Sequence, residues 1–512
     1  MTFLTSLLYL DLFENHISGF IPQEIGNLNF LTYLDLSYNN LSGSIPASLL
    51  NLTKLGSLFL NSNQLSGIIP RDIGRLSSLT TLDLSLNNLT GSIPTSVCNL
   101  TSLTYLAFPG NSLSDNLPRE IGALRSLTGF FLGKNNLSGS IPSSLTNLTS
   151  LVDLELFGNQ LSGIIPQDIG RLHSLTRLGF SKNNFSGIIP QDIGRLRSLT
   201  KLSFAGNNFN GSIPTSLTNL TSLTFISLAN NQLSGIIPRD IGRLSALTSL
   251  EFSTNNLFGR IPISICNLTN LTYLSFYGNQ LSGIIPRDLG NLRSLSNLSN
   301  LRILSLSNNH LTGSLPIELN NLIQLKQLDL GNNSLSGNIP TTVWHCKNLT
   351  YLNLCSNNLT GNISNEIGTA GELRYLILNE NNFSGTPPKS IGNLQYLKVL
   401  HLANNKFEGD IPTEFCSLRD LRILSLKSNK FNGSIPMEIN HLHQLRILDL
   451  SQNSLNKQIP SSMWNLKKLT SRVNDTFSID DVVSSFGVEM VIKGNILEVE
   501  VISLPISETC RV

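Results

Sequence analysis

The segment LTFISLANNQLSGIIPRDIGRL, residues 223–244, contains the pattern from which the fold of this chain can be predicted. Its first apolar residues are spaced by three and then by two, with polar or variable residues between them. Side chains alternate between the two sides of a β-strand. We therefore expect a short strand in which Ile226 and Leu228 face one way and Ser227 faces the other.

Three residues after this strand have distinct backbone roles. Asn231 recurs as Asn255 and Asn279 in the next two copies. An Asn side chain donates and accepts hydrogen bonds, so we expect a column of Asn to satisfy backbone groups where the chain leaves the strand. Gly235 permits backbone conformations that other residues resist, and Pro238 fixes its own φ and lacks a donor. Both indicate a turn or extended segment outside the sheet.

The same pattern recurs about every 24 residues, in about 19 units. One unit cannot bury its apolar row alone, but neighbours stacked on both sides can. We therefore predict an α/β repeat solenoid over residues 1–469, followed by a non-repeat tail over residues 470–512. The spacing slips once, because Leu274 and its next equivalent, Leu304, are separated by six extra residues near 293–300. We expect an extra turn on the outer side there, with the stack continuing.

Composition excludes several classes of function. The net charge of the 512 residues is +2, which gives no general attraction to nucleic acid. No run of about 18 uncharged apolar residues is present, so no membrane-spanning helix is expected. The start of the chain already keeps the repeat register and has no basic segment typical of a secretory signal.

The full pattern, LxxLxxLxLxxNxLxGxIPxxIGxL, resembles the plant-type extracellular leucine-rich repeat over roughly residues 4–469. The chain is similar to the ectodomains of plant leucine-rich repeat receptor-like kinases and receptor-like proteins. The resemblance implies a right-handed superhelix with a parallel inner β-sheet and short 3-10 or helical outer segments. It also implies a peptide or protein ligand, and a co-receptor kinase with a short leucine-rich repeat ectodomain.

The chain departs from those receptors in four respects. It has no signal peptide, no cysteine-paired cap, no membrane helix and no kinase motif. We therefore expect a fragment or a truncated product that is not itself an enzyme, although the full-length family often carries a Ser/Thr kinase domain. The resemblance places it on the extracellular side of the plasma membrane or in the apoplast, with membrane attachment only through segments absent from this chain.

Function is expected on the inner, concave sheet, where the copies differ from one another. Most variable positions beside the strand leucines carry small residues, whereas aromatic and charged residues gather in the middle. Aromatic side chains give a large contact area, and Arg or Lys binds carboxylates. Packing of aromatic residues on one another is the alternative interpretation. The candidate ligand-binding residues are Tyr105, Phe131, Glu155, Phe157, Arg177, Lys201, Phe225, Glu251, Tyr273 and Tyr277.

The residue two positions before the strand leucine changes along the chain. It is usually Thr up to Thr272, and mostly a cation afterwards. The cations are Arg302, Lys326, Arg374, Lys398, Arg422 and Arg446. Two interpretations remain open: a solvated margin that keeps the surface soluble, or a strip that attracts an acidic partner.

Cysteine and histidine residues give little support for a chemical site. Cys98, Cys266 and Cys416 share one repeat position and are expected to be small buried residues. Cys346 and Cys355 are candidates for a disulfide or for two free thiols. With His345 they lack a fourth metal ligand, so no metal, cofactor or catalytic residue is predicted.

Many Asn-x-Ser/Thr acceptors arise from the repeat consensus, on turns or on the outer side. Glycans there would leave the inner sheet bare. The acceptors singled out are Asn40, Asn51, Asn88, Asn99, Asn136, Asn147, Asn184, Asn219, Asn267, Asn358 and Asn382.

The sequence thus predicts a ligand-recognition ectodomain fragment of a plant cell-surface receptor. Its ligand would be a secreted peptide or a microbial or cell-wall-derived elicitor, bound for signalling or defence. Two alternatives remain: a secreted leucine-rich repeat inhibitor of fungal cell-wall-degrading enzymes, and a non-functional truncated duplicate. In the tail, the alternation around Gly494 and Asn495 predicts a β-hairpin, with a tail of no fixed fold as the alternative.

Overall fold

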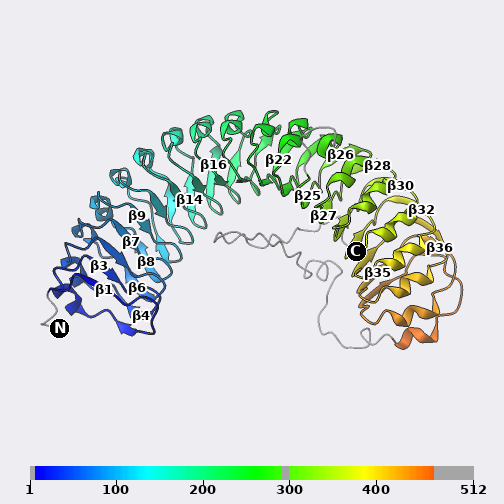
Figure 1. The fold of residues 1–512 in the computed structure, drawn as a ribbon, viewed down its shortest axis with the longest axis horizontal. Helices are drawn as coiled ribbons and strands as arrows, with labels where there is room; N and C mark the ends of the chain where they lie inside the picture. Colours follow the sequence, from blue (N-terminus) through cyan, green and yellow to red (C-terminus); the bar gives the residue numbers. More distant parts are fainter. Residues whose placement is uncertain (1–5, 291–298, 466–512) are drawn as a thin grey trace. The chain divides into compact units, whose positions relative to one another are not determined.

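The computed structural model describes residues 6–290 and 299–465. The chain divides into two compact units, Met1–Asn256 and Leu257–Val512. In each unit the repeats follow one another in sequence order, as the colours of Figure 1 show. The predicted tail hairpin and most of the six-residue insertion lie outside the described residues.

Each repeat contributes one three-residue strand to a parallel sheet. The strands pair in register, so that Leu202 lies beside Ile226 and Ile226 beside Leu250, and all three are fully buried. The first and third residues of each strand point to the other side, which we call the inner face. The strands of the first unit are β1 (Tyr9–Asp11), β3 (Tyr33–Asp35), β5 (Ser57–Phe59), β7 (Thr81–Asp83), β9 (Tyr105–Ala107), β11 (Gly129–Phe131), β13 (Asp153–Glu155), β15 (Arg177–Gly179), β17 (Lys201–Ser203), β19 (Phe225–Ser227) and β21 (Ser249–Glu251). Those of the second unit are β23 (Tyr273–Ser275), β25 (Ile303–Ser305), β27 (Gln327–Asp329), β29 (Tyr351–Asn353), β31 (Tyr375–Ile377), β33 (Val399–His401), β35 (Ile423–Ser425) and β37 (Ile447–Asp449).

A second short strand follows in most repeats and forms lateral parallel sheets. Its Gly has a positive φ, for example 80° at Gly235, so the predicted need for Gly is confirmed. In the first unit these strands are β2 (Ser18–Phe20), β4 (Asn40–Gly43), β6 (Gln64–Ile68), β8 (Asn88–Ser92), β10 (Ser112–Ser114), β12 (Ser138–Ser140), β14 (Gln160–Gly163), β16 (Asn184–Ile188), β18 (Asn208–Asn210) and β20 (Ser234–Gly235). In the second they are β22 (Asn256–Gly259), β24 (Gln280–Gly283), β26 (His310–Gly313), β28 (Ser334–Gly337), β30 (Asn358–Gly361), β32 (Asn382–Gly385), β34 (Lys406–Gly409) and β36 (Lys430–Phe431).

Short 3-10 helices close the repeats. Pro precedes many of them, as Pro190 does with a φ of −62°, which suits a helix start because Pro lacks the N–H that would be unsatisfied there. Where Ser364 replaces this Pro, its hydroxyl accepts a bond from the Glu366 N–H instead, at 3.1 Å. The helices of the first unit are η1 (Gln23–Asn27), η2 (Ala47–Asn51), η3 (Ile73–Arg75), η4 (Thr95–Asn99), η5 (Ile121–Ala123), η6 (Ser143–Asn147), η7 (Ile169–Arg171), η8 (Gln191–Arg195), η9 (Thr215–Asn219) and η10 (Ile241–Arg243). Those of the second are η11 (Ile263–Asn267), η12 (Arg287–Gly290), η13 (Ile317–Asn321), η14 (Thr341–His345), η15 (Asn365–Thr369), η16 (Lys389–Asn393), η17 (Thr413–Ser417), η18 (Met437–His441) and η19 (Ser461–Asn465).

A ladder of buried Asn side chains connects consecutive repeats, as the sequence predicts. The amide nitrogen of Asn183 donates to the carbonyl of Leu156, 27 residues earlier, at 3.0 Å. Its carbonyl oxygen accepts from the Leu161 N–H, 22 residues earlier, at 3.0 Å. Each Asn thus satisfies backbone groups of the preceding repeat.

The six-residue insertion leaves the stack intact. Tyr273 pairs with Ile303 and Leu274 with Leu304, in the same register as other neighbouring repeats. The Leu281 N–H still reaches the Asn column, at Asn309, although 28 residues now separate them. The expectation that the stack continues past the insertion is therefore confirmed.

Burial is incomplete in the first repeat. Leu10 and Leu12 are half-buried, whereas their equivalents Leu34 and Leu36 are 0% and 6% exposed. Interior repeats are covered on both sides, whereas the first described strand, β1, pairs on one side only, with β3.

Candidate functional site

An aromatic cluster lies on the inner face of the first unit. Tyr105 opens β9 and Phe131 ends β11, and their ring centroids are 5.3 Å apart. Gly129 makes room for both rings, because a Cβ there would lie 2.7 Å from Phe131 and 3.1 Å from Tyr105. Both aromatic residues are half-buried, so part of each ring stays open to a ligand.

Phe157 sits on a second glycine. It lies two residues beyond β13, and a Cβ on Gly133 would come within 2.5 Å of its ring. Gly179 has the same relation to Glu155, whose carboxylate oxygen would be 1.8 Å from such a Cβ. Neither glycine was among the predicted site residues. The sequence does contain a signal for them: a glycine in one repeat next to an unusually large side chain in the neighbouring repeat.

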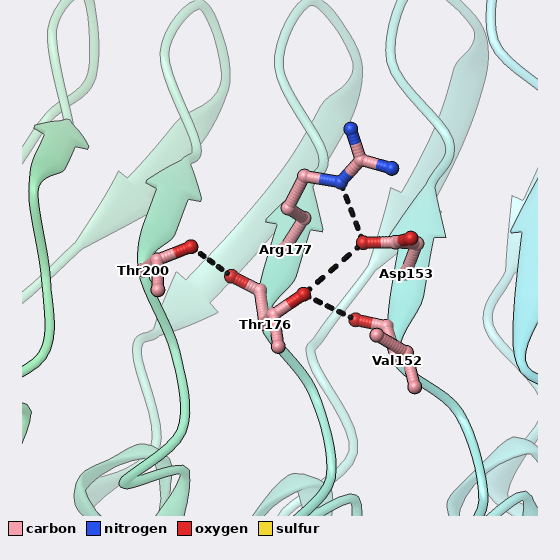
Figure 2. A network of polar contacts seen from close by, with 5 residues as sticks. All are labelled: Val152, Asp153, Thr176, Arg177 and Thr200. Carbon is pink, nitrogen blue, oxygen red and sulfur yellow. Dashed lines mark hydrogen bonds and ion pairs between the residues drawn. The ribbon is translucent and has the colours of Figure 1, made fainter.

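An ion pair connects two neighbouring strands beside the aromatic residues (Figure 2). Arg177 Nε donates to Asp153 Oδ1 at 2.5 Å, and this bond raises the pKa of the guanidinium. Thr176 Oγ1 donates to the same carboxylate and to the carbonyl of Val152, both at 3.3 Å. Arg177 was a predicted site residue, but its partner Asp153 was not. Their pairing becomes visible only when β13 and β15 are placed side by side.

Two glutamates of the predicted set are buried. Glu155 is 8% exposed, and burial raises its pKa to about 7 against the opposing positive charges of Arg177 and Lys201. Glu251, at the end of β21, is 7% exposed and accepts a 2.7 Å bond from Ser227 Oγ. Burial raises its pKa as well. Near neutral pH, Glu155 can therefore donate as well as accept a hydrogen bond.

The remaining predicted residues fall into two places. Lys201 and Phe225 open the paired strands β17 and β19 and are half-buried, on the same face as the cluster. Tyr273 and Tyr277 belong to the second unit, at β23 and two residues beyond it, and Tyr273 is only 7% exposed. The structure thus gathers the predicted residues from Tyr105 to Glu251 on one face of the first unit.

This face runs over β9, β11, β13, β15, β17, β19 and β21, each paired with the next. At about 4.8 Å per strand it is about 29 Å long, the length of about nine residues of extended peptide. It offers aromatic surface, an ion pair and a protonatable carboxyl on neighbouring strands. Side chains of these kinds are suited to contacts with an extended peptide.

Most of the cysteines that the structure describes are buried free thiols. Cys98, Cys266 and Cys416 are buried free thiols, as predicted, and burial raises the pKa of Cys98 to about 11. Cys346 is also a free thiol, whereas Cys355 is in a disulfide, so these two do not pair with each other. Among the residues that the structure describes, no group of three His, Cys, Asp or Glu is arranged to hold a metal.

The predicted glycan acceptors lie on the surface. Asn147 and Asn382 are half-buried and the other nine are exposed. Ten of the eleven lie at the end of a 3-10 helix or at the start of a lateral strand, and Asn136 lies two residues before β12. Their occupancy remains a prediction. Among the described residues, no helix has the length and apolar character needed to cross a membrane.

Comparison with known proteins agrees with this architecture. The sequence matches the Leucine rich repeat family over residues 53–113, 299–359 and 371–431, with further single repeats matched over 6–28, 30–52, 150–172, 174–196, 198–220, 222–244, 270–292 and 444–466. The chain belongs to the leucine-rich repeat family. All of its family matches are leucine-rich repeats, and no catalytic family is among them. A search of curated proteins found no match.

Several solved structures similar to this leucine-rich repeat chain are plant receptor-kinase ectodomains. Arabidopsis HAESA, in complex with the peptide hormone IDA and the co-receptor SERK1, is 37% identical with a TM-score of 0.84, over 90% of this chain and 76% of that one. The plant peptide hormone receptor RGFR1, in complex with RGF2, is 35% identical with a TM-score of 0.80, over 91% and 81%. PEPR1 with AtPEP1 is 34% identical with a TM-score of 0.75, over 92% and 72%. The chain is therefore a leucine-rich repeat ectodomain of the plant receptor-kinase type.

Proposed function

We propose that this chain is the ligand-recognition part of a plant cell-surface receptor, and that it binds a secreted peptide or an elicitor on the inner face from β9 to β21. One observation carries the proposal: aromatic rings rest on Gly129 and Gly133, beside a charged pair, on consecutive strands. Glycines that make room for large side chains on the sheet leave a broad surface. The similar structures include complexes with peptide hormones, which supports a peptide ligand.

Binding would use three kinds of contact. The rings of Tyr105, Phe131 and Phe157 provide apolar area at low cost in side-chain entropy. The Arg177 guanidinium, already oriented by Asp153, keeps N–H groups to donate to a ligand carboxylate or carbonyl. Glu155, neutral or charged around pH 7, accepts or donates according to the ligand.

A receptor role also requires a signalling partner and a cellular location. The complex of HAESA contains a co-receptor, which supports a co-receptor kinase as partner for this chain. We place the chain on the extracellular side of the plasma membrane or in the apoplast, where its Asn-x-Ser/Thr acceptors would carry glycans. The repeat solenoid over 1–469 is then the receptor's binding domain, with 470–512 outside it.

The test removes the aromatic surface and measures peptide capture. The purified chain and two triple variants are incubated with plant and fungal secretomes, and retained peptides are identified by mass spectrometry. The inner-face variant is Phe131→Ala, Phe157→Ala and Phe225→Ala. The control removes apolar groups that are about half-exposed on the lateral strands, by Ile68→Ala, Ile164→Ala and Ile188→Ala.

We expect the wild-type chain and the control to retain the same peptides and the inner-face variant to lose them. Unchanged capture by the inner-face variant, with both variants folded by circular dichroism, would refute the assignment of this face.

A further inference from the structure

A column of four cations follows one edge of the sheet in the second unit. Arg374, Lys398, Arg422 and Arg446, here called the cation ladder, directly precede β31, β33, β35 and β37. Backbone bonds of 2.8 Å connect each to the next, from Lys398 N to Arg374 O, Arg422 N to Lys398 O and Arg446 N to Arg422 O. Like charges therefore repeat at about the strand spacing of 4.8 Å.

The repeat itself does not require these cations. In the first unit the same position is mostly Thr, whose hydroxyl bonds the preceding carbonyl, as Thr200 does to Thr176 at 2.9 Å (Figure 2). A Thr thus satisfies a backbone group, whereas Arg or Lys at the same place puts a charge on the rim. Four such replacements in successive repeats bring like charges close together, and their mutual repulsion is unfavourable.

Three of the four ladder cations lack an ion-pair partner among the described residues. None of the ion pairs found there involves Arg374, Lys398 or Arg446. Lys398 is half-buried, and burial together with the charges of Arg422 and Arg374 lowers its pKa, against partial opposition from Asp420. A negatively charged group bound along the ladder would relieve this field.

Apolar side chains lie beside the ladder. Val399 and Ile423, the first residues of β33 and β35, form a buried cluster against which the partly buried Tyr375 and Ile447 pack. Apolar residues thus border the ladder along its whole length. Those at its two ends, Tyr375 and Ile447, are partly exposed.

Unsatisfied polar groups lie on the same strands. His401, at the end of β33, is 4% exposed, and neither ring nitrogen makes a hydrogen bond of good geometry, although the backbone of Ser425 lies near enough to favour the charged imidazole. Ser425 Oγ on the adjacent strand and Asn379 Oδ1 are also buried without a partner. Burial lowers the pKa of His401 to about 4, so its imidazole is neutral and offers one donor and one acceptor. Buried polar groups without partners are rare because they lose their hydrogen bonds to water without replacement.

We propose that the cation ladder and its apolar border form a docking surface for an extended acidic segment of a partner polypeptide. Carboxylates would pair with the ladder, and apolar side chains would contact Tyr375 and Ile447. A uniform polyanionic polysaccharide supplies the carboxylates but no apolar side chain. The surface lies wholly in the second unit, so it does not depend on the ligand face of the first.

Three probes distinguish the possible occupants. They are a synthetic peptide in which Glu alternates with Leu, the matched peptide with Gln in place of Glu, and polygalacturonate. Binding to the full chain is measured by fluorescence anisotropy, with polygalacturonate as competitor, from low to physiological salt. Salt weakens contacts between exposed charges, because the screening length falls to about 8 Å at physiological ionic strength.

Two triple variants remove the same charge from the second unit. The ladder variant is Arg374→Gln, Lys398→Gln and Arg446→Gln. The control, on exposed cations elsewhere in the unit, is Lys347→Gln, Lys406→Gln and Lys430→Gln. We expect the Glu peptide to bind the wild type and the control with affinities within about twofold of each other, and the ladder variant at least about tenfold more weakly.

A charge reversal keeps the proposal testable if the ladder variant folds poorly. Lys398→Glu with Arg446→Glu should lose the Glu peptide and gain affinity for a peptide in which Lys alternates with Leu. The proposal would be overturned if both triple variants lost the same affinity, or if the Gln peptide bound as well as the Glu peptide. It would also be overturned if polygalacturonate competed as strongly as the Glu peptide, or if the charge reversal did not switch the preference between peptides.

Discussion

Replacing Asn183 with Ala should test the Asn ladder that holds the repeats together. Asn183 is 6% exposed, and its amide nitrogen donates to the carbonyls of Leu156, Phe180 and Ser181 at 3.0, 3.1 and 3.3 Å. Its oxygen accepts the N–H of Leu161 at 3.0 Å. Alanine keeps the backbone conformation available but removes all four bonds.

The expected loss of stability follows from what is left unpaired. The Leu161 N–H loses its partner, and an unsatisfied buried donor costs about 1–3 kcal/mol. The Leu156 carbonyl keeps a second donor, because Asn159 also bonds it at 3.0 Å, so its loss is smaller. We therefore expect the free energy of unfolding to fall by about 2–4 kcal/mol.

The assay combines urea unfolding with hydrogen exchange read by mass spectrometry. Because each repeat contacts only its neighbours, the loss of protection should be concentrated in the repeats that contain Leu161 and Asn183. The matched control is Asn184→Ala, an exposed neighbour, which should change stability by less than about 0.5 kcal/mol. If the two variants are equally stable and equally protected, the ladder does not hold the repeats together.

Three further outcomes follow from buried groups of the first unit. Burial raises the pKa of Glu155 to about 7, so the folded state holds a proton that the unfolded state releases near pH 4.5. The free energy of unfolding should therefore fall as the pH rises between these two values, by about 3 kcal/mol at most. In urea unfolding at pH 5 and pH 7.5, Glu155→Gln should remove this dependence on pH. A Cβ on Gly122 would lie 2.1 Å from the carbonyl oxygen of Ser144 in the next repeat. Gly122→Ala should therefore reduce the free energy of unfolding by about 1–3 kcal/mol and lower the thermal midpoint. The control Gly371→Ala, at a position where nothing lies within 4 Å of the added Cβ, should leave the midpoint unchanged. Burial raises the pKa of Cys98 to about 11, so its alkylation by iodoacetamide at pH 8 should be far slower in the native chain than in urea; equal rates would contradict its burial.

Most of the fold is predictable because its determinants are local and repeated. The spacing of Leu, Asn, Gly and Pro specifies strand, ladder, turn and helix start in every copy, and the structure confirms each role. Even the exception at Ser364 keeps the helix start by other chemistry. Periodicity averages over many copies, so a single substitution does not obscure it.

The candidate site is less predictable because its determinants are relations between repeats. The sequence marks Phe131 and Phe157 as unusual, but not that Gly129 and Gly133 hold their rings. It marks Arg177 but not its bond to Asp153, 24 residues earlier. Nor does it indicate that the carboxyl of Glu155 is buried. Each of these depends on which side chains lie opposite one another across the sheet, and a single row of letters does not show that.

The Asn ladder has a consequence for how such a chain varies in length. Its bonds connect residues 22 and 27 positions apart, and across the insertion before Ile303 the same bonds connect residues 28 and 33 apart. The ladder thus depends on which repeat comes next and not on the number of residues between. Duplication or deletion of a whole repeat of about 24 residues would leave every remaining Asn with the same four partners. Recombination between copies can therefore lengthen or shorten the recognition surface while the fold of each repeat is retained.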